Sequence, residues 1–328
     1  VECRVPQAQD HVASTLALMW NGRSFVQTVQ AGAAVFLLGS RLSSRKQRAE
    51  LACSGYAGHA DHLPARKELQ QYRIQTEDGE TMLHVWEGCQ IFADGCGVRK
   101  WPAADDLLSY LSPMGRPRHL QESAGAGASR WSGQRVLELG CGCGFLTLSL
   151  ACCGAEVTAA DNNPAALALC AASASKAKAD GRFASGGKVF LRRLDWTDAH
   201  SCAKLLEERG PFDLVVAADC VMALPPCGPM WRAMGATACP PDELLAATRR
   251  LSGQRTQVVI AVVDRAGDVA ATARELLVRH ANLEILELPA DYPGGSCPVT
   301  VFHFRWRSQG ENSRRPLDPN CTEQREVE

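Results

Sequence analysis

The sequence lacks an excess of charge of either sign, and it lacks a long apolar run. It holds 35 Lys and Arg residues against 36 Asp and Glu residues, and its net charge is −1. Because nucleic-acid binding depends on basic residues that neutralise phosphates, this balance argues against a nucleic-acid partner. The apolar stretch at residues 31–39 is too short to span a membrane. We therefore expect neither a nucleic acid nor a membrane as a partner.

The chain also lacks a signal-peptide pattern at its start. Its 15 cysteines are an odd number in a chain of 328 residues, which is not typical of a small secreted disulfide framework. Several lie inside apolar runs, where a free cysteine packs as a small hydrophobe. We expect reduced thiols and a cytoplasmic or nuclear location. Because the chain opens with Val1, organelle targeting stays an open alternative.

Composition and pattern divide the chain into four expected parts. Residues 1–67 form an N-terminal extension without an assigned role. Residues 68–130 contain a hairpin with a turn at Asp78-Gly79, a helix over 101–111 and a loop rich in Pro, Gly and Ser. Residues 131–307 are the main domain, and the polar residues 308–328 are expected to be a disordered tail.

Apolar β-like runs alternate with helical segments throughout residues 131–307, which favours a parallel sheet with helices on both faces. The seven expected strands are residues 136–140, 156–161, 188–196, 212–220, 256–265, 283–288 and 299–306. A Pro/Gly-rich turn alone separates the last two, so they should form an antiparallel edge hairpin.

A glycine-rich turn follows the first of these strands. The segment reads Val136-Leu137-Glu138-Leu139-Gly140-Cys141-Gly142-Cys143-Gly144 and continues as an apolar helix. Glycines let the backbone approach a ligand closely, and the helix start offers free N–H groups. A dinucleotide site needs a small residue where the bulky Phe145 stands, so that ligand class is disfavoured.

The spacing Glu-x-Gly-x-Gly-x-Gly resembles the first motif of seven-strand S-adenosylmethionine-dependent methyltransferases. Asp161 ends the next strand about 20 residues further on, the separation at which such folds hold ribose hydroxyls. Leu194-Asp195-Trp196 closes the third strand, where an acidic or aromatic side chain can border the adenine. The resemblance implies an α/β, Rossmann-like class I methyltransferase fold with S-adenosyl-L-methionine as its cofactor.

Three segments narrow the resemblance to the family-16 group of protein-lysine methyltransferases. They are Trp101-Pro102-Ala103-Ala104, Leu194-Asp195-Trp196 and Ala217-Ala218-Asp219-Cys220-Val221. The resemblance covers roughly residues 72–306. The cofactor-binding residues that it implies are Trp101, Glu138, Gly140, Cys141 through its backbone, Gly142, Gly144, Asp161, Trp196 and Ala218.

The predicted catalytic residue is Asp219, a carboxylate that would hold the incoming ammonium and position it as it loses its proton. The family pattern here is Asp-x-x-Tyr, whereas this chain has Met222 in the Tyr position. Met supplies neither a hydroxyl nor a π-face. Another aromatic residue such as Tyr292 or Trp231 would replace it, turnover would be slow, or the substrate would differ. Residues 222–241 are expected to form an irregular loop that faces the substrate.

Plainer interpretations of the same residues stay open. The glycine segment would be a tight turn that binds nothing, and Asp161 would cap the helix that starts near Pro164, a role compatible with ribose binding. Trp101 and Trp196 would be core aromatics, and Asp219 a helix cap or a solvated loop residue. A zinc site is a further candidate, at Cys141, Cys143, Cys152 and Cys153. We disfavour it because the spacing of these cysteines is not that of zinc knuckles. His303 is expected to be an ordinary strand residue.

Our leading hypothesis is a methyltransferase that modifies a lysine side chain of another protein by direct displacement, a reaction that requires no metal and no covalent nucleophile. One alternative is a different acceptor, such as a histidine, a protein N-terminus or a small amine. The other is a non-catalytic interaction protein with the same fold. The sequence leaves the oligomeric state and the substrate protein open.

Overall fold

The structure, a computed structural model, describes residues 59–76, 78–90, 94–112, 131–221, 241–263, 269–278, 280–288 and 299–307. Most of the N-terminal extension, the loop before residue 131, the expected substrate-facing loop and the tail lie outside these residues. So do Met222, Trp231 and Tyr292.

A two-stranded antiparallel hairpin opens the described chain after the short 3-10 helix η2 (His59–His62). Its strands are β1 (Lys67–Thr76) and β2 (Gly79–Gly88), and Thr76 pairs with Gly79 across the turn. Gly79 has φ 118°, a conformation that suits glycine. The predicted hairpin is confirmed, and its antiparallel pairing continues from the turn to Lys67 and Gly88.

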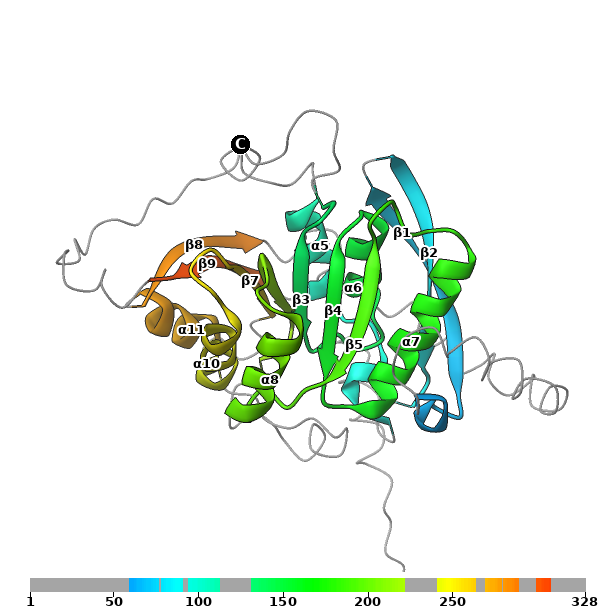
Figure 1. Cartoon of the computed structure of the whole chain (residues 1–328), viewed down its shortest axis with the longest axis horizontal. Helices are drawn as coiled ribbons and strands as arrows, with labels where there is room; N and C mark the ends of the chain where they lie inside the picture. Colours follow the sequence, from blue (N-terminus) through cyan, green and yellow to red (C-terminus); the bar gives the residue numbers. More distant parts are fainter. Residues whose placement is uncertain are drawn as a thin grey trace, which may run out of the picture.

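A seven-stranded sheet forms the centre of the molecule, with the strand order β5-β4-β3-β6-β7-β9-β8 (Figure 1). The strands are β3 (Arg135–Leu139), β4 (Glu156–Asp161), β5 (Lys188–Arg193), β6 (Leu214–Ala218), β7 (Gln257–Val263), β8 (Ala281–Leu288) and β9 (Val299–Trp306). The first five run parallel, whereas β9 pairs antiparallel with both β7 and β8. The predicted seven-strand sheet with an edge hairpin is confirmed.

Helices cover both faces of the sheet, as the sequence predicts. Helices α5 (Ala103–Leu111), α6 (Phe145–Cys152) and α7 (Pro164–Ala179) share their apolar clusters with one face. The other face packs against α8 (Ala199–Arg209), α10 (Pro241–Leu251) and α11 (Val269–Val278). Figure 1 shows α10 and α11 on one side of the molecule and the hairpin beyond α7 on the other.

The hairpin packs against the main domain through an apolar cluster of its own. Ile74, Leu83 and Val85 lie in one buried cluster with Phe145 of α6 and Leu169 of α7.

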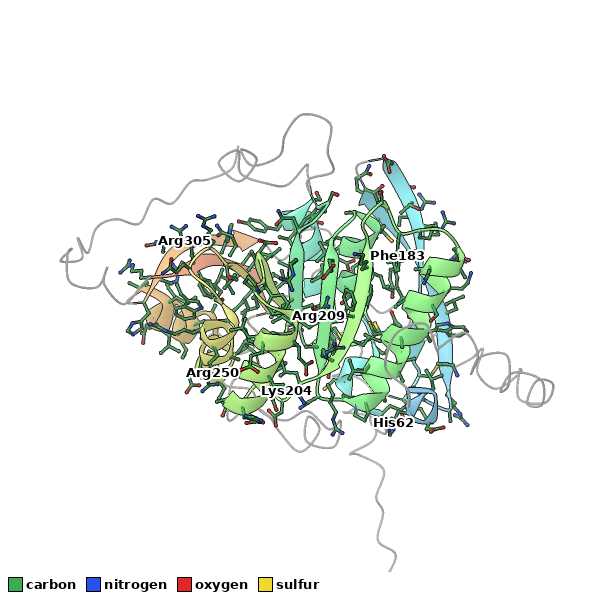
Figure 2. The ribbon with its side chains drawn as sticks, viewed as in Figure 1. His62, Phe183, Lys204, Arg209, Arg250 and Arg305 are labelled. Atoms are coloured by element: carbon green, nitrogen blue, oxygen red, sulfur yellow. The ribbon has the colours of Figure 1, made fainter. Side chains whose placement is uncertain are left out.

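On the opposite helical layer, Arg209 at the end of α8 contacts the sheet (Figure 2). Its guanidinium lies 2.7 Å from Glu156 and 3.5 Å from the centre of the Phe190 ring.

Several predicted strand bounds are wrong by one to three residues, and the carboxyl ends of β5 and β6 are two of them. β5 stops at Arg193, whose partner Asp161 is the last residue of β4. The Leu194 N–H still donates to the Asp161 carbonyl at 3.0 Å, but β4 does not extend far enough to pair with residues 195–196. Instead, the Asp195 side chain accepts the Thr197 N–H at 3.0 Å and starts a turn. β6 stops at Ala218 because Asp219 takes a left-handed conformation, with φ 56°.

Candidate functional site

The predicted site residues gather where the chain changes direction within the sheet. From β3 the chain builds outward through β4 to β5, and then returns to place β6 on the other side of β3. In parallel sheets, ligands bind at the carboxyl ends of the strands at such a switch point. The glycine turn follows β3, and Asp219 follows the neighbouring β6.

Glycine is required in this turn by both conformation and crowding. Gly140, Gly142 and Gly144 have φ angles of 67°, 53° and 93°. A Cβ at position 144 would lie 2.5 Å from Sγ of Cys170 in α7, closer than two atoms can pack. Gly144 is also the N-cap of α6, and its N–H donates to the Cys141 carbonyl at 2.9 Å. The turn therefore brings α6 close to α7.

Asp161 is joined to the glycine turn by a hydrogen bond. Its Oδ2 accepts the Gly142 N–H at 2.9 Å, and its Oδ1 accepts the Asn163 N–H at 2.8 Å. The residue is 7% exposed, and burial raises the pKa of its carboxyl while these N–H groups oppose the rise. The N-cap of α7 is Asn163, which accepts the Ala165 N–H at 2.9 Å, so the capping interpretation of Asp161 is wrong.

Glu138 lies inside the protein and contacts α6. It is 3% exposed, and its carboxylate accepts a hydrogen bond from the Thr147 hydroxyl. Burial raises the pKa of this carboxyl to about 8, although the Thr147 hydrogen bond acts in the opposite direction. In the structure, Glu138 therefore supports the helix after the glycine turn; the direct cofactor contact that the resemblance implies stays a prediction.

A short loop that the sequence analysis did not identify covers the glycine turn. We call residues 94–101 the cover loop; it contains the 3-10 helix η3 (Cys96–Val98) and ends at Trp101. A Cβ on Gly142 would lie 2.8 Å from the Gly97 carbonyl oxygen. The Asn163 amide donates to the Asp94 carbonyl at 2.8 Å, and the Trp101 indole N–H donates to the Cys96 carbonyl at 2.9 Å. The sequence signal that could have indicated this loop is the pair of glycines, Gly95 and Gly97, just before the Trp-Pro-Ala-Ala motif.

Trp196 and Cys220 contact the first glycine of the turn. A Cβ on Gly140 would lie 2.5 Å from Sγ of Cys220 and 3.6 Å from the Trp196 ring. The Cys220 thiol is 3.1 Å from the Leu139 carbonyl oxygen. Cys141 uses its backbone N–H inside the sheet, donating to the Ala160 carbonyl at 3.0 Å. That N–H is therefore already engaged, which limits the predicted backbone contact of Cys141.

Asp219 has an unusual backbone. It is the one non-glycine residue with positive φ among the described part of the chain. Its N–H donates at 2.9 Å to the carbonyl of Ala261 in β7, which joins the residue after β6 to the neighbouring strand. Ala218 precedes it as the last residue of β6 and is half-buried. Strained residues of this kind concentrate at functional sites, where the surrounding structure holds them in place.

The other candidate residues from the sequence are the four cysteines of the zinc hypothesis and His303. Cys141, Cys143, Cys152 and Cys153 are buried free thiols. Within the described residues, no three His, Cys, Asp or Glu side chains group in a way that could hold a metal ion. His303 lies in β9, and its ring nitrogens contact the Tyr110 hydroxyl at 2.9 Å and the Gln257 amide oxygen at 3.0 Å. The prediction that it is a strand residue is confirmed.

None of the helices in the described ranges is both long enough and apolar enough to cross a bilayer.

Comparison with solved structures finds methyltransferases of varied substrates. A TehB-like S-adenosylmethionine-dependent methyltransferase from Corynebacterium glutamicum is 18% identical, with 65% of this chain and 91% of that chain covered and a TM-score of 0.37. The 16S rRNA N2 G1207 methyltransferase of T. thermophilus, in complex with AdoMet and guanosine, is 18% identical, with a TM-score of 0.41. The match covers 75% of this chain and 52% of that chain. Magnesium protoporphyrin IX methyltransferase from Synechocystis PCC 6803, with bound S-adenosylmethionine, is 16% identical over 62% and 77%, with a TM-score of 0.40.

Comparison with curated proteins finds no match. A family model described as lysine methyltransferase matches residues 78–261, from the hairpin turn into β7. This range contains Trp101, the glycine turn and Asp219. Because the match spans more than half of the chain, the protein belongs to the lysine methyltransferase family, and its cofactor is S-adenosyl-L-methionine.

Proposed function

We propose that this methyltransferase transfers its methyl group to the ε-amino group of a lysine in another protein. The family description supports a lysine acceptor. The observation that carries the proposal is the position of Asp219, a carboxylate in a strained conformation at the switch point beside the glycine turn. A carboxylate at this edge of the sheet can accept a charge-assisted hydrogen bond from an acceptor ammonium next to the cofactor.

The residues around the glycine turn fit the cofactor. Asp161 is a buried acceptor suited to ribose hydroxyls, because its two backbone N–H partners leave further lone pairs on its oxygens. Trp101 and Trp196 would border the remainder of the molecule, from the cover loop and from the segment after β5. When bound, S-adenosylmethionine supplies a methyl group on a positively charged sulfur.

The chain itself has to align and partly desolvate the acceptor amine. Asp219 would accept a hydrogen bond from the lysine ammonium and hold its nitrogen in line with the methyl group as the proton leaves. The ammonium proton would pass to solvent water, because only the neutral amine has the lone pair that forms the new N–C bond as the methyl–sulfur bond breaks and sulfur keeps its electron pair. Alignment and water exclusion account for the rate without a covalent enzyme intermediate.

Asp219→Asn tests this role. The variant should bind the cofactor like the wild type but transfer methyl groups at least about 100-fold more slowly, because the amide cannot hold an ammonium as a carboxylate does. Isothermal titration with S-adenosylmethionine measures binding, and transfer of a radiolabelled methyl group to lysate proteins measures turnover. Asp213→Asn, at the opposite edge of the sheet, is the matched control. Unchanged turnover in Asp219→Asn would refute the catalytic role.

A different acceptor is a second candidate, favoured by Met222 in place of the family Tyr. Hydrolysis of the labelled protein separates the two, because methyl-lysine supports the first proposal and methyl-histidine or a methylated N-terminus supports the second. Cofactor binding without label on any protein or small amine would favour a non-catalytic interaction protein.

A further inference from the structure

We propose that the β1–β2 hairpin determines cofactor affinity, because Glu87 and Lys100 position the cover loop on the glycine turn. The inference rests on the proposed placement of the cofactor at that turn. Neither side chain has to touch the cofactor, since both would act through Gly97 and Trp101, so they are positioning residues.

Glu87 joins the hairpin to the cover loop. It lies in β2, is 3% exposed, and accepts hydrogen bonds on both carboxylate oxygens. The Tyr72 hydroxyl of β1 donates to Oε1, and Nε of Arg99 in the cover loop donates to Oε2 at 3.2 Å. A carboxylate buried to this extent requires both partners, because an unpaired buried charge is strongly unfavourable. Arg99 is therefore held at a fixed place beside the hairpin.

Burial of Tyr72 strengthens this arrangement. The pKa of its hydroxyl is raised well above the usual range, first by burial and then by the charge of Glu87. The hydroxyl stays protonated and can only be a donor toward the carboxylate. β1 therefore donates to Glu87 through the Tyr72 hydroxyl, and the cover loop donates to the same carboxylate through Arg99.

Lys100 joins the cover loop to the start of α6. Its ammonium pairs with Asp105 of α5 and lies 4.4 Å from the centre of the Tyr72 ring and 4.7 Å from that of the Phe145 ring. The two rings are packed edge to face, with centroids 5.0 Å apart. Phe145 follows Gly144 directly, so Lys100 contacts the residue next to the glycine turn. Cation–π contacts are strongest where the cation is shielded from water, as it is here.

The cover loop is consequently held at three places that surround Gly97. The hairpin holds Arg99 and Lys100, while Asn163 of the α7 N-cap holds Asp94. Loss of one of these contacts leaves the sheet and its helices intact but releases the backbone that contacts Gly142. Apolar side chains could also fill the space between the hairpin and the cover loop. The distinctive contribution of Glu87, Arg99 and Lys100 is therefore the orientation that they impose on the cover loop.

Two variants test the proposal, and one matched control accompanies them. Glu87→Gln removes the buried charge, and Lys100→Met removes the ammonium while keeping an unbranched side chain. Glu80→Gln makes the same chemical change in the same hairpin, where the 3.9 Å pair of Glu80 with Arg73 is 61% and 74% exposed. Isothermal titration with S-adenosylhomocysteine should show affinity about tenfold lower for Glu87→Gln and Lys100→Met, and unchanged for Glu80→Gln.

Hydrogen exchange provides a readout that separates positioning from general stability. In both variants, we expect faster exchange of the amides of residues 94–101, while those of β3 and α6 stay as protected as in the wild type. Cofactor addition should slow exchange in the wild-type cover loop much more than in the variants. Loss of protection in β3 and α6 together with the cover loop would indicate a merely structural role and overturn the proposal.

The failure of this inference is distinguishable from the failure of the proposed cofactor site. If the wild type does not bind S-adenosylhomocysteine, the cofactor site is misplaced. If the wild type binds and all variants bind equally well, the cofactor site stands and the positioning role is wrong. Should Glu87→Gln fail to fold, Lys100→Met and Tyr72→Phe test the same cluster, and unchanged affinity in both would overturn the proposal.

Discussion

At the scale of single residues, the two carboxylates near the glycine turn differ in what stabilises their charge. Asp161 accepts hydrogen bonds from the backbone N–H groups of Gly142 and Asn163. Glu138 accepts a hydrogen bond from one side-chain hydroxyl, that of Thr147, and burial raises its pKa to about 8. Glu138 therefore changes its charge close to neutral pH. We therefore expect the free energy of unfolding to depend on pH.

We expect Glu138→Gln to remove this pH dependence. Between pH 4.5, the ordinary value for a Glu carboxyl, and about pH 8, the folded state holds a proton that the unfolded state has lost. The free energy of unfolding of the wild type should therefore fall as pH rises through this range, by up to about 1.4 kcal/mol per pH unit relative to the variant. Denaturant titrations at pH 5 to 9 measure the difference.

Glu207→Gln on the exposed surface of α8 controls for the substitution itself. Parallel pH profiles for the wild type and Glu138→Gln would mean that Glu138 is ionised in the folded protein throughout this range.

Asp161→Ala should weaken cofactor binding. The change removes a buried carboxylate acceptor from the predicted ribose site and releases the Gly142 N–H. A hydrogen bond to a charged group contributes about 1.5–3 kcal/mol, so we expect a cofactor affinity about 10- to 100-fold lower by isothermal titration. Asp213→Ala removes a similar carboxylate, one that accepts the Arg135 N–H at 2.8 Å, from the other edge of the sheet. Equal affinities for Asp161→Ala and the wild type would exclude the ribose role.

At the scale of elements, α6 can start where it does because Gly144 leaves room for α7. The helix is buried along its whole length, so it has no exposed face that would let it shift. Its first residue, Phe145, contacts the hairpin through Tyr72, and Thr147 contacts Glu138. The glycine turn thus fixes the contacts of a helix as well as a ligand site.

Gly144→Ala should destabilise the protein more than Gly181→Ala does. Both glycines have positive φ, 93° and 64°, but a Cβ at 144 would lie 2.5 Å from the Cys170 sulfur, whereas nothing lies within 4 Å of one at 181. We expect a loss of about 1 kcal/mol at 181 from the backbone alone, and of about 3 kcal/mol or more at 144. Thermal and urea unfolding measure both. Equal losses would show that α7 moves away without cost.

Cys170→Ala in combination with Gly144→Ala provides a second test of the crowding. If the contact with the sulfur causes the loss, the double variant should be more stable than the two single losses predict. Exact additivity would exclude the clash as the cause.

The ends of strands and helices are the features that the local sequence pattern predicts least well. The apolar run at 188–196 predicts a strand to residue 196, but β5 is an edge strand and can extend only as far as β4 does. Likewise, helix capping was the alternative interpretation of Asp161, and Asn163 two residues later caps α7 instead. Both outcomes depend on a partner that is distant in the sequence or on backbone geometry, so a local pattern does not reveal them.

At the scale of the whole molecule, the hairpin and the main domain share an apolar cluster. Leu83 and Val85 of β2 are fully buried and lie in one cluster with Phe145 and Leu169. Hairpins of two strands are marginally stable alone, so packing against α6 and α7 stabilises this one. We therefore expect the hairpin to unfold together with the sheet.

Leu83→Ala tests this coupling. The cavity should lower the free energy of unfolding by about 2–5 kcal/mol, and the protein should still unfold in a single transition. Circular dichroism in the far and near ultraviolet, followed through the same urea titration, compares the loss of secondary structure with that of tertiary packing. Leu69→Ala, on the exposed side of β1, is the control and should have little effect. Two separate transitions would show that the hairpin folds on its own.

The sequence by itself determined the seven strands, the antiparallel last pair, the family and the cofactor. The strands follow from apolar periodicity along the chain, whereas the family and the cofactor are what the resemblance of the glycine, tryptophan and aspartate motifs implied. Only the tertiary structure decided which glycine faces α7, that Glu138 turns toward Thr147, and that Asp219 is strained between β6 and β7. It also revealed the cover loop, whose contacts with Glu87, Tyr72 and Asn163 join residues far apart in the chain. Such contacts depend on which elements pack side by side, and no local pattern encodes that.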